Sequence, residues 1–203
     1  MSFHEIIIAV MAGFALLGAA DRIFGNRWGL GKEFEEGVMA MGSLALAMVG
    51  IVSLAPVLAR VLKPVVVPIF GFLGADPAMF AGTLLGVDAG AYPLAMEMAG
   101  GDVASGSFSG VVLGGTFGII LLGMIPISLE LLREEDREVF SAAVLLAIIT
   151  IPLGCIAGGL VMSLTAYPMA FSVMIANLIP VILVAALIAL GLYFRPKQMM
   201  NAF

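Results

Sequence analysis

Residues 139–194, VFSAAVLLAIITIPLGCIAGGLVMSLTAYPMAFSVMIANLIPVILVAALIALGLYF, contain no Asp, Glu, Lys or Arg. A helix needs about 20 apolar residues to cross a bilayer, so this run is long enough for two crossings. The turn-like segment LTAYP at 164–168 divides it. Two further uncharged runs, Gly37–Ala59 and Val103–Leu129, each hold one more crossing. The sequence therefore predicts an all-α, polytopic transmembrane helical bundle.

The composition of the 203-residue chain supports this class and excludes others. The chain is 62% hydrophobic and 11% charged, whereas about a quarter of a soluble domain is charged. The net charge is -5 and basic residues do not cluster, so we expect no nucleic-acid partner. The only cysteine, Cys155, has no disulfide partner in the chain and is interpreted as a small packing residue. The first apolar segment follows His4 and Glu5 rather than basic residues, which favours a retained helix over a signal peptide.

We expect a single transmembrane domain over residues 1–203. Its membrane segments are predicted at 5–21, 37–59, 64–75 (short or interfacial), 78–98 (broken or re-entrant), 107–129, 139–163 and 170–194. Lipid gives no hydrophobic drive to helix association, so small residues that let backbones approach closely are informative. Glycines spaced by four predict a tightly packed bundle, and they are Gly82, Gly86, Gly90, Gly110, Gly114, Gly118, Gly154 and Gly158.

The segment GTLLGVDAGAYPLAMEMAGGD, residues 82–102, places an acid in apolar surroundings. If residues 78–91 are helical, Asp88 lies opposite the glycine stripe, and Tyr92 shares its face. A carboxylate beside an aromatic ring suits a small ammonium ion. Pro93 disfavours helix at Tyr92, and broken helices near mid-membrane are where transporters bind substrates. Acids within the membrane are functional by default. The alternatives for Asp88 are a structural pair with Arg22, Arg60 or another basic residue, or a position at the membrane interface.

Three other polar residues are weaker candidates for substrate binding. Glu36 lies at the mouth of a small-residue face, but it is also placed to interact with the dipole of a helix N-terminus. Glu97 approaches the far end of the broken segment, where it can be solvated. Asn177 can contact a ligand, although a hydrogen bond across helices is the more ordinary use of a buried amide.

The sequence lacks the groups that most enzymes need. The only histidine is His4, which excludes Ser–His catalysis and a two-histidine zinc helix. No phosphate loop or cofactor fingerprint is present, so we expect neither an enzyme nor a cofactor.

Three blocks of the sequence closely resemble the ethanolamine utilization protein EutH family. They are FEEGVMAMGSLALAMVGIVSLAPVLARVLKPV, GADPAMFAGTLLGVDAGAYPLAMEMAGGDVA and IPLGCIAGGLV. The resemblance implies a permease of the bacterial inner membrane, embedded in the lipid bilayer, that admits ethanolamine or a similar small amine. It also implies a chain about twice as long, with a second half that is a distant repeat of the first. The 203 residues therefore resemble one half of a repeat-built transporter, to be completed by that second half or by another copy.

Two functions remain open from the sequence. The first is a permease for a small organic cation, with Asp88 as counter-charge, Tyr92 as a cation–π wall and Glu36 or Glu97 as a second polar contact. The second is a membrane scaffold or assembly subunit that packs through its glycine stripes. A passive small-amine channel is intermediate between them.

Overall fold

The structure is a computed structural model that describes residues 3–201. These residues form helices and connecting turns without any β-strand, and the chain divides into two compact units, Met1–Gly50 and Ile51–Phe203. Within the described range, five helical segments are long and apolar enough to cross a membrane: His4–Ile23, Met48–Phe72, Val103–Leu131, Glu134–Met162 and Phe171–Phe194. The predicted polytopic helical membrane protein is confirmed.

The first unit is a hairpin of α1 (Phe3–Ile23) and the beginning of α2 (Leu30–Phe72). Asp21 organises the turn between them: it is 2% exposed, and its carboxylate accepts hydrogen bonds from the backbone N–H groups of Trp28 (3.0 Å) and Gly31 (2.9 Å). An ion pair between Arg22 and Glu35 (2.6 Å) links the two helices close to the same turn. The hairpin therefore satisfies its buried acid with backbone donors rather than with a cation.

Helix α2 contains both segments that the sequence analysis treats separately, 37–59 and 64–75. Its candidate membrane span is Met48–Phe72, although Pro56, Pro64 and Pro68 lie inside the helix. Proline is tolerated in membrane helices because neighbouring groups can satisfy the backbone carbonyls that lose a donor. Hydropathy therefore identifies the apolar residues of this region, but it does not show that they belong to one continuous helix.

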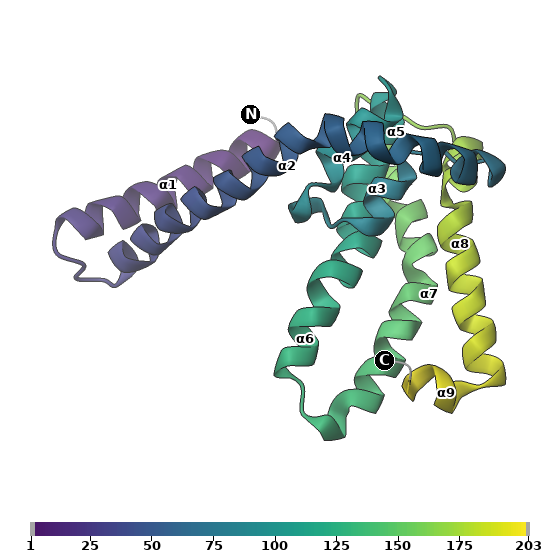
Figure 1. The fold of residues 1–203 in the computed structure, drawn as a ribbon. Helices are drawn as coiled ribbons and strands as arrows, with labels where there is room; N and C mark the ends of the chain where they lie inside the picture. The colour runs from purple at the N-terminus through teal and green to yellow at the C-terminus, as the bar shows by residue number, and fades with distance from the viewer. Residues whose placement is uncertain (1–2, 202–203) are drawn as a thin grey trace. The chain divides into compact units, whose positions relative to one another are not determined.

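The second unit holds the remaining elements (Figure 1). They are, in chain order, α3 (Met79–Leu84), η1 (Val87–Ala89), α4 (Ala91–Ala99), α5 (Val103–Ser107), η2 (Phe108–Gly118), η3 (Ile120–Met124), α6 (Ile125–Leu131), η4 (Glu134–Asp136), α7 (Arg137–Met162), α8 (Phe171–Phe194) and α9 (Pro196–Asn201). In Figure 1, α6, α7 and α8 extend away from the end at which α3, α4 and α5 gather. The elements η2 and η3 have the wide π-helical turn, a form often found at functional sites.

The core of this unit is built on backbone contact between α3 and η2. The hydroxyl of Ser109, which is fully buried, donates to the carbonyl of Ala78 and accepts from the N–H of Gly82. A side chain on Gly82 would collide with the carbonyl oxygen of Ser109, and one on Gly110 would collide with the backbone of Tyr92. The tight packing predicted from the glycine spacing is therefore present along η2.

The glycines on α7 behave differently from the prediction. A side chain on Gly158 would meet Val112 at 2.8 Å, but no atom of the described residues lies within 4 Å of the corresponding position on Gly154. Cys155 is buried between them, and its sulfur lies 3.3 Å from the hydroxyl of Thr116. Its interpretation as a small packing residue agrees with this placement.

Candidate functional site

The helix that begins at Met79 breaks before it reaches Asp88. Helix α3 ends at Leu84, and Leu85 and Gly86 are extended. Asp88 lies on the single turn η1, and Gly90 then adopts a left-handed conformation with φ 91°. The working assumption of a helix over 78–91, with one stripe of Gly82, Gly86 and Gly90, is wrong because these extended and left-handed residues interrupt it. The predicted break in the segment 78–98 itself is present.

Pro93 does not cause this break; it occupies the first turn of the next helix, α4. Proline fits there because the N–H groups of the first turn have no partner within the helix. Gly90 serves as the N-cap residue, and its positive φ suits a residue without a Cβ. The glycine therefore terminates the short turn around Asp88 and allows α4 to start.

The turn that carries Asp88 packs near the middle of a candidate membrane span. A Cβ atom added to Gly86 would lie 3.4 Å from the Cα of Ile119. A Cβ atom added to Gly114 would lie 3.4 Å from the backbone nitrogen of Val87. Ile119 is close to the middle of the candidate span Val103–Leu131. The extended residues and η1 therefore pack across the centre of this span, which is where the binding sites of repeat-built transporters occur.

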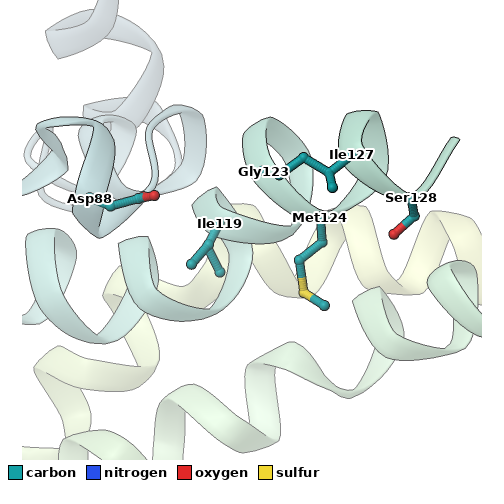
Figure 2. Close-up of a pocket in the computed structure, with 6 residues that line it drawn as sticks. All are labelled: Asp88, Ile119, Gly123, Met124, Ile127 and Ser128. Atoms are coloured by element: carbon teal, nitrogen blue, oxygen red, sulfur yellow. The ribbon is translucent and has the colours of Figure 1, made fainter. Parts of the chain in front are cut away.

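A cavity of about 260 Å³ adjoins the carboxylate, and we call it the Asp88 groove (Figure 2). It is lined by Asp88, Ile119, Gly123, Met124, Ile127 and Ser128. The five residues other than Asp88 follow one face of the continuous η2–η3–α6 segment. In Figure 2 the carboxylate of Asp88 points toward the Ile119 end, and Ser128 lies at the opposite end.

Asp88 has no counter-ion within the described residues. Its side chain is exposed, and the ion pairs among those residues do not include it. Arg22, one of the two arginines proposed as its structural partner, instead pairs with Glu35. An unpaired carboxylate at the centre of a bilayer costs about 2.5–3.5 kcal/mol on insertion scales, so it is expected to face water or a positive partner rather than lipid.

The other predicted site residues do not line the Asp88 groove. Tyr92 is 40% exposed and lies on α4 with its backbone against Gly110. Glu97 is exposed, and its backbone carbonyl accepts from the ammonium of Lys63 at 2.9 Å. The predicted arrangement of a carboxylate beside an aromatic ring is therefore not assembled at this cavity.

Glu36 and Asn177 have other partners in the structure. Glu36 lies in the first unit and pairs with Lys32 at 3.5 Å, one helical turn away. Asn177 is 2% exposed on α8, and its side-chain oxygen accepts from the backbone N–H of Asp76 at 2.9 Å. A hydrogen bond between two structural elements is the ordinary role expected of a buried amide. The side chain of Ser43, on the same predicted face as Glu36, lies outside the described residues.

The sequence profile of the family described as "Ethanolamine utilisation protein, EutH" matches residues 3–203. The chain belongs to the EutH family. It is 52% identical to the probable ethanolamine permease EutH of Listeria monocytogenes over 203 residues, which are 100% of this chain and 53% of that protein. It is 47% identical to the probable ethanolamine permease EutH of Escherichia coli, covering 100% of this chain and 55% of that protein. An uncharacterized protein of Bacillus subtilis, YxeR, is 42% identical over the whole chain.

The chain spans about half the length of the curated relatives it matches. No solved structure matches it significantly. The resemblance to the EutH family found in the sequence is thus confirmed.

Sequence reasoning missed the residues that complete the groove. The lining residues Ile119, Gly123 and Ile127 are spaced by four. Met124 directly follows Gly123, and Ser128 directly follows Ile127. This spacing identifies a helix face but not the segment that it faces. The pairing with Asp88 depends on the break at Leu85 and Gly86, which only the fold reveals.

Two further acids, Asp76 and Asp102, flank the broken segment. Burial raises the pKa of Asp76, and the negative charge of Asp102 adds to the increase. Asp102 itself begins α5: its carboxylate accepts from the backbone N–H of Ala104 (3.0 Å) and from the hydroxyl of Ser105 (2.7 Å). The Ser105 hydroxyl bond is the main reason that the pKa of Asp102 is lowered. Asp102 therefore caps the N-terminus of α5, and the carboxylate of Asp76 accepts from the backbone N–H of Ala78 (2.7 Å), just before α3.

We predict that Asp102→Ala lowers the stability of the protein by about 1 kcal/mol at neutral pH, because an N-cap is lost. Folding lowers the pKa of Asp102. The contribution of its carboxylate to folding stability is therefore fully present above the unfolded pKa of about 3.9, and it is lost as the pH falls through the lower pKa of the folded state. Thermal unfolding in detergent at pH 7 and below pH 4 measures this. The two proteins should differ at pH 7 and converge in acid, and Asp102→Asn, which keeps a capping oxygen, should remain close to wild type at pH 7. An equal difference at both pH values would contradict the assignment.

Proposed function

We propose that the protein containing this chain is a permease of the bacterial inner membrane for ethanolamine, and that Asp88 is the counter-charge to the ammonium group. One observation carries the proposal: Asp88 has no ion-pair partner within the described residues, lies on a turn that packs near the middle of a candidate membrane span, and borders a cavity. Two relatives that align with the whole chain carry the name probable ethanolamine permease.

The chemistry of the Asp88 groove suits a small ammonium alcohol. At neutral pH ethanolamine carries one positive charge, two methylene groups and a hydroxyl. Asp88 supplies the opposite charge, and the apolar side chains of Ile119, Met124 and Ile127 suit the methylene groups. A water needs only about 10–15 Å³ of such volume, so a cavity of about 260 Å³ holds a four-heavy-atom cation together with several waters.

The transport claim is tested by uptake of labelled ethanolamine into cells or proteoliposomes. The measurement is made at low concentration and acidic pH, where diffusion of the neutral amine across the bilayer is smallest. We expect saturable uptake that excess unlabelled ethanolamine inhibits and that the uncharged analogue ethylene glycol does not. Uptake no faster than in empty vesicles would contradict a transporter, and a rate that never saturates would indicate a passive channel instead.

A membrane scaffold is the second candidate, because the backbone contacts of the glycines suit an assembly role. A scaffold predicts that Gly86→Leu prevents assembly while Asp88→Asn has no effect on the function. In the structure, a side chain on Gly86 would meet the carboxylate of Asp88 at 2.6 Å. Gly86→Leu is thus expected to damage both roles, so Asp88→Asn is the variant that distinguishes them.

A further inference from the structure

The Asp88 groove extends from mid-span toward one end of the helix that lines it. Its lining residues on this helix run from Ile119, near the middle of Val103–Leu131, to Ser128, three residues before its end. Ile119 and Ser128 are nine residues apart, which is about 13 Å at the α-helical rise and less where η3 is π-helical, yet still longer than one ethanolamine molecule. A single substrate bound at Asp88 therefore cannot also contact Ser128, and the far end of the groove must have another use.

The far end of the groove is polar and adjoins an acidic loop. Ser128 is partly buried, and its hydroxyl has no hydrogen-bond partner within the described residues, whereas the hydroxyls of Thr116 and Ser141 bond to carbonyls of their own helices. The carbonyl of Ser128 accepts from the N–H of Leu132, so the loop to α7 starts directly at this end. Around that loop lie five acids and two arginines: Glu130, Arg133, Glu134, Glu135, Asp136, Arg137 and Glu138.

We propose that the Asp88 groove is a hydrated entry path that opens at the 132–136 loop, so that ammonium ions reach Asp88 from that side of the membrane. This inference rests on the proposed function for the identity of the cation. The acids of the loop raise the local concentration of cations at the mouth, and the Ser128 hydroxyl replaces part of their hydration as they enter. The unpaired carboxylate of Asp88 then provides the opposite charge at the inner end.

Cysteine labelling tests the path without depending on transport. Gly123→Cys and Ser128→Cys place a thiol at the middle and at the mouth of the groove. Gly123 tolerates a side chain because its Cβ would meet only Ile119, at 3.6 Å. Leu122→Cys is the matched control: Leu122 is 48% exposed on the same turn but does not line the groove. Glu135→Cys reports on which side of the membrane the loop lies, and the native Cys155 is buried and should stay unlabelled.

The thiols are labelled with membrane-impermeant thiosulfonates in sealed vesicles of both orientations. A thiol reacts as the thiolate, which forms in water but not in lipid. We expect Gly123→Cys and Ser128→Cys to react from the same side as Glu135→Cys and at least ten times faster than Leu122→Cys. A cationic reagent should react several times faster than an anionic one of similar size, and ethanolamine should slow the labelling of Gly123→Cys.

Three results would overturn the entry path. The first is that Gly123→Cys is labelled no faster than Leu122→Cys. The second is that the groove thiols are labelled from the side of the membrane opposite to Glu135→Cys. The third is that the cationic and anionic reagents label the groove thiols at equal rates. The first means that lipid or protein covers the groove. Labelling as predicted in a protein that takes up no ethanolamine would leave the path intact and reject the proposed function, so the two can fail separately.

Discussion

Gly118→Ala is expected to lower the yield and the melting temperature of the folded protein markedly, whereas Gly115→Ala is expected to have little effect. A methyl group on Gly118 would fall on the carbonyl oxygen of Leu85 and lie 2.8 Å from that of Gly82. Both obstacles are backbone atoms, so a change of side-chain rotamer cannot relieve them. Overpacking typically costs about 1–3 kcal/mol and sometimes more, and we expect the upper end of this range.

The comparison is made by size-exclusion chromatography of fluorescent-protein fusions, followed by thermal unfolding in detergent. Gly115 lies on the same π-helical segment and has nothing within 4 Å of its Cβ position, so its replacement controls for the loss of a glycine as such. Equal yields and melting temperatures for the two variants would mean that the extended residues 85–86 do not pack on η2 as the structure places them.

Asp88→Asn is expected to lower ethanolamine uptake at low concentration by roughly ten- to a hundredfold. A hydrogen bond to a charged group contributes about 1.5–3 kcal/mol, and each 1.4 kcal/mol is about a factor of ten in affinity. The amide preserves the size of the side chain and removes only the negative charge. Initial rates are measured below saturation and normalised to the amount of protein in the membrane.

Glu97→Gln is the matched control for Asp88→Asn. It removes one exposed negative charge from the neighbouring helix α4 without touching the Asp88 groove, so uptake should stay within about twofold of wild type. If both variants lose uptake equally, the effect is a general one of surface charge. Undiminished uptake by Asp88→Asn would remove this acid from the mechanism.

Most of the long apolar helices follow from the sequence because hydropathy locates them. The uncharged run 139–194 contains α7 except for its first two residues, the turn at 164–168 and the whole of α8. The second span was harder to locate. The uncharged run ends at Ala59, yet the helix continues to Phe72 through Arg60 and Lys63, and the side chain of Lys63 reaches the carbonyl of Glu97. Hydropathy places the end of the span at these charged residues, but a tertiary hydrogen bond to the Glu97 carbonyl satisfies the ammonium of Lys63.

The break beside Asp88 was predictable in kind but not in detail. Pro93 and the glycines indicated an interrupted helix, but proline is also well suited to the first turn of a new helix, and that is its position in α4. The interruption lies instead at Leu85 and Gly86, where the backbone approaches η2 closely. Because that approach involves residues more than 25 positions apart, no local pattern contains it.

The predicted partners of Asp88 show the same limit. Tyr92 was chosen for its spacing from Asp88, and that spacing has no meaning once the helix breaks between them. Met124 and Ser128 share a groove with Asp88 only through the fold, and they carry no signal that separates them from other residues of an apolar span. Asn177 was recognised as a buried amide, and it binds the backbone of Asp76.

Equilibrium binding of ethanolamine to the purified protein is the most direct test of Asp88 as the counter-charge. Binding is measured by calorimetry or by a thermal shift, in wild type and in Asp88→Asn, with ethylene glycol as the uncharged ligand. We predict that wild type binds ethanolamine but not ethylene glycol, and that Asp88→Asn remains folded with at least tenfold weaker binding of ethanolamine. Equal affinity of the two proteins for ethanolamine would contradict the proposal.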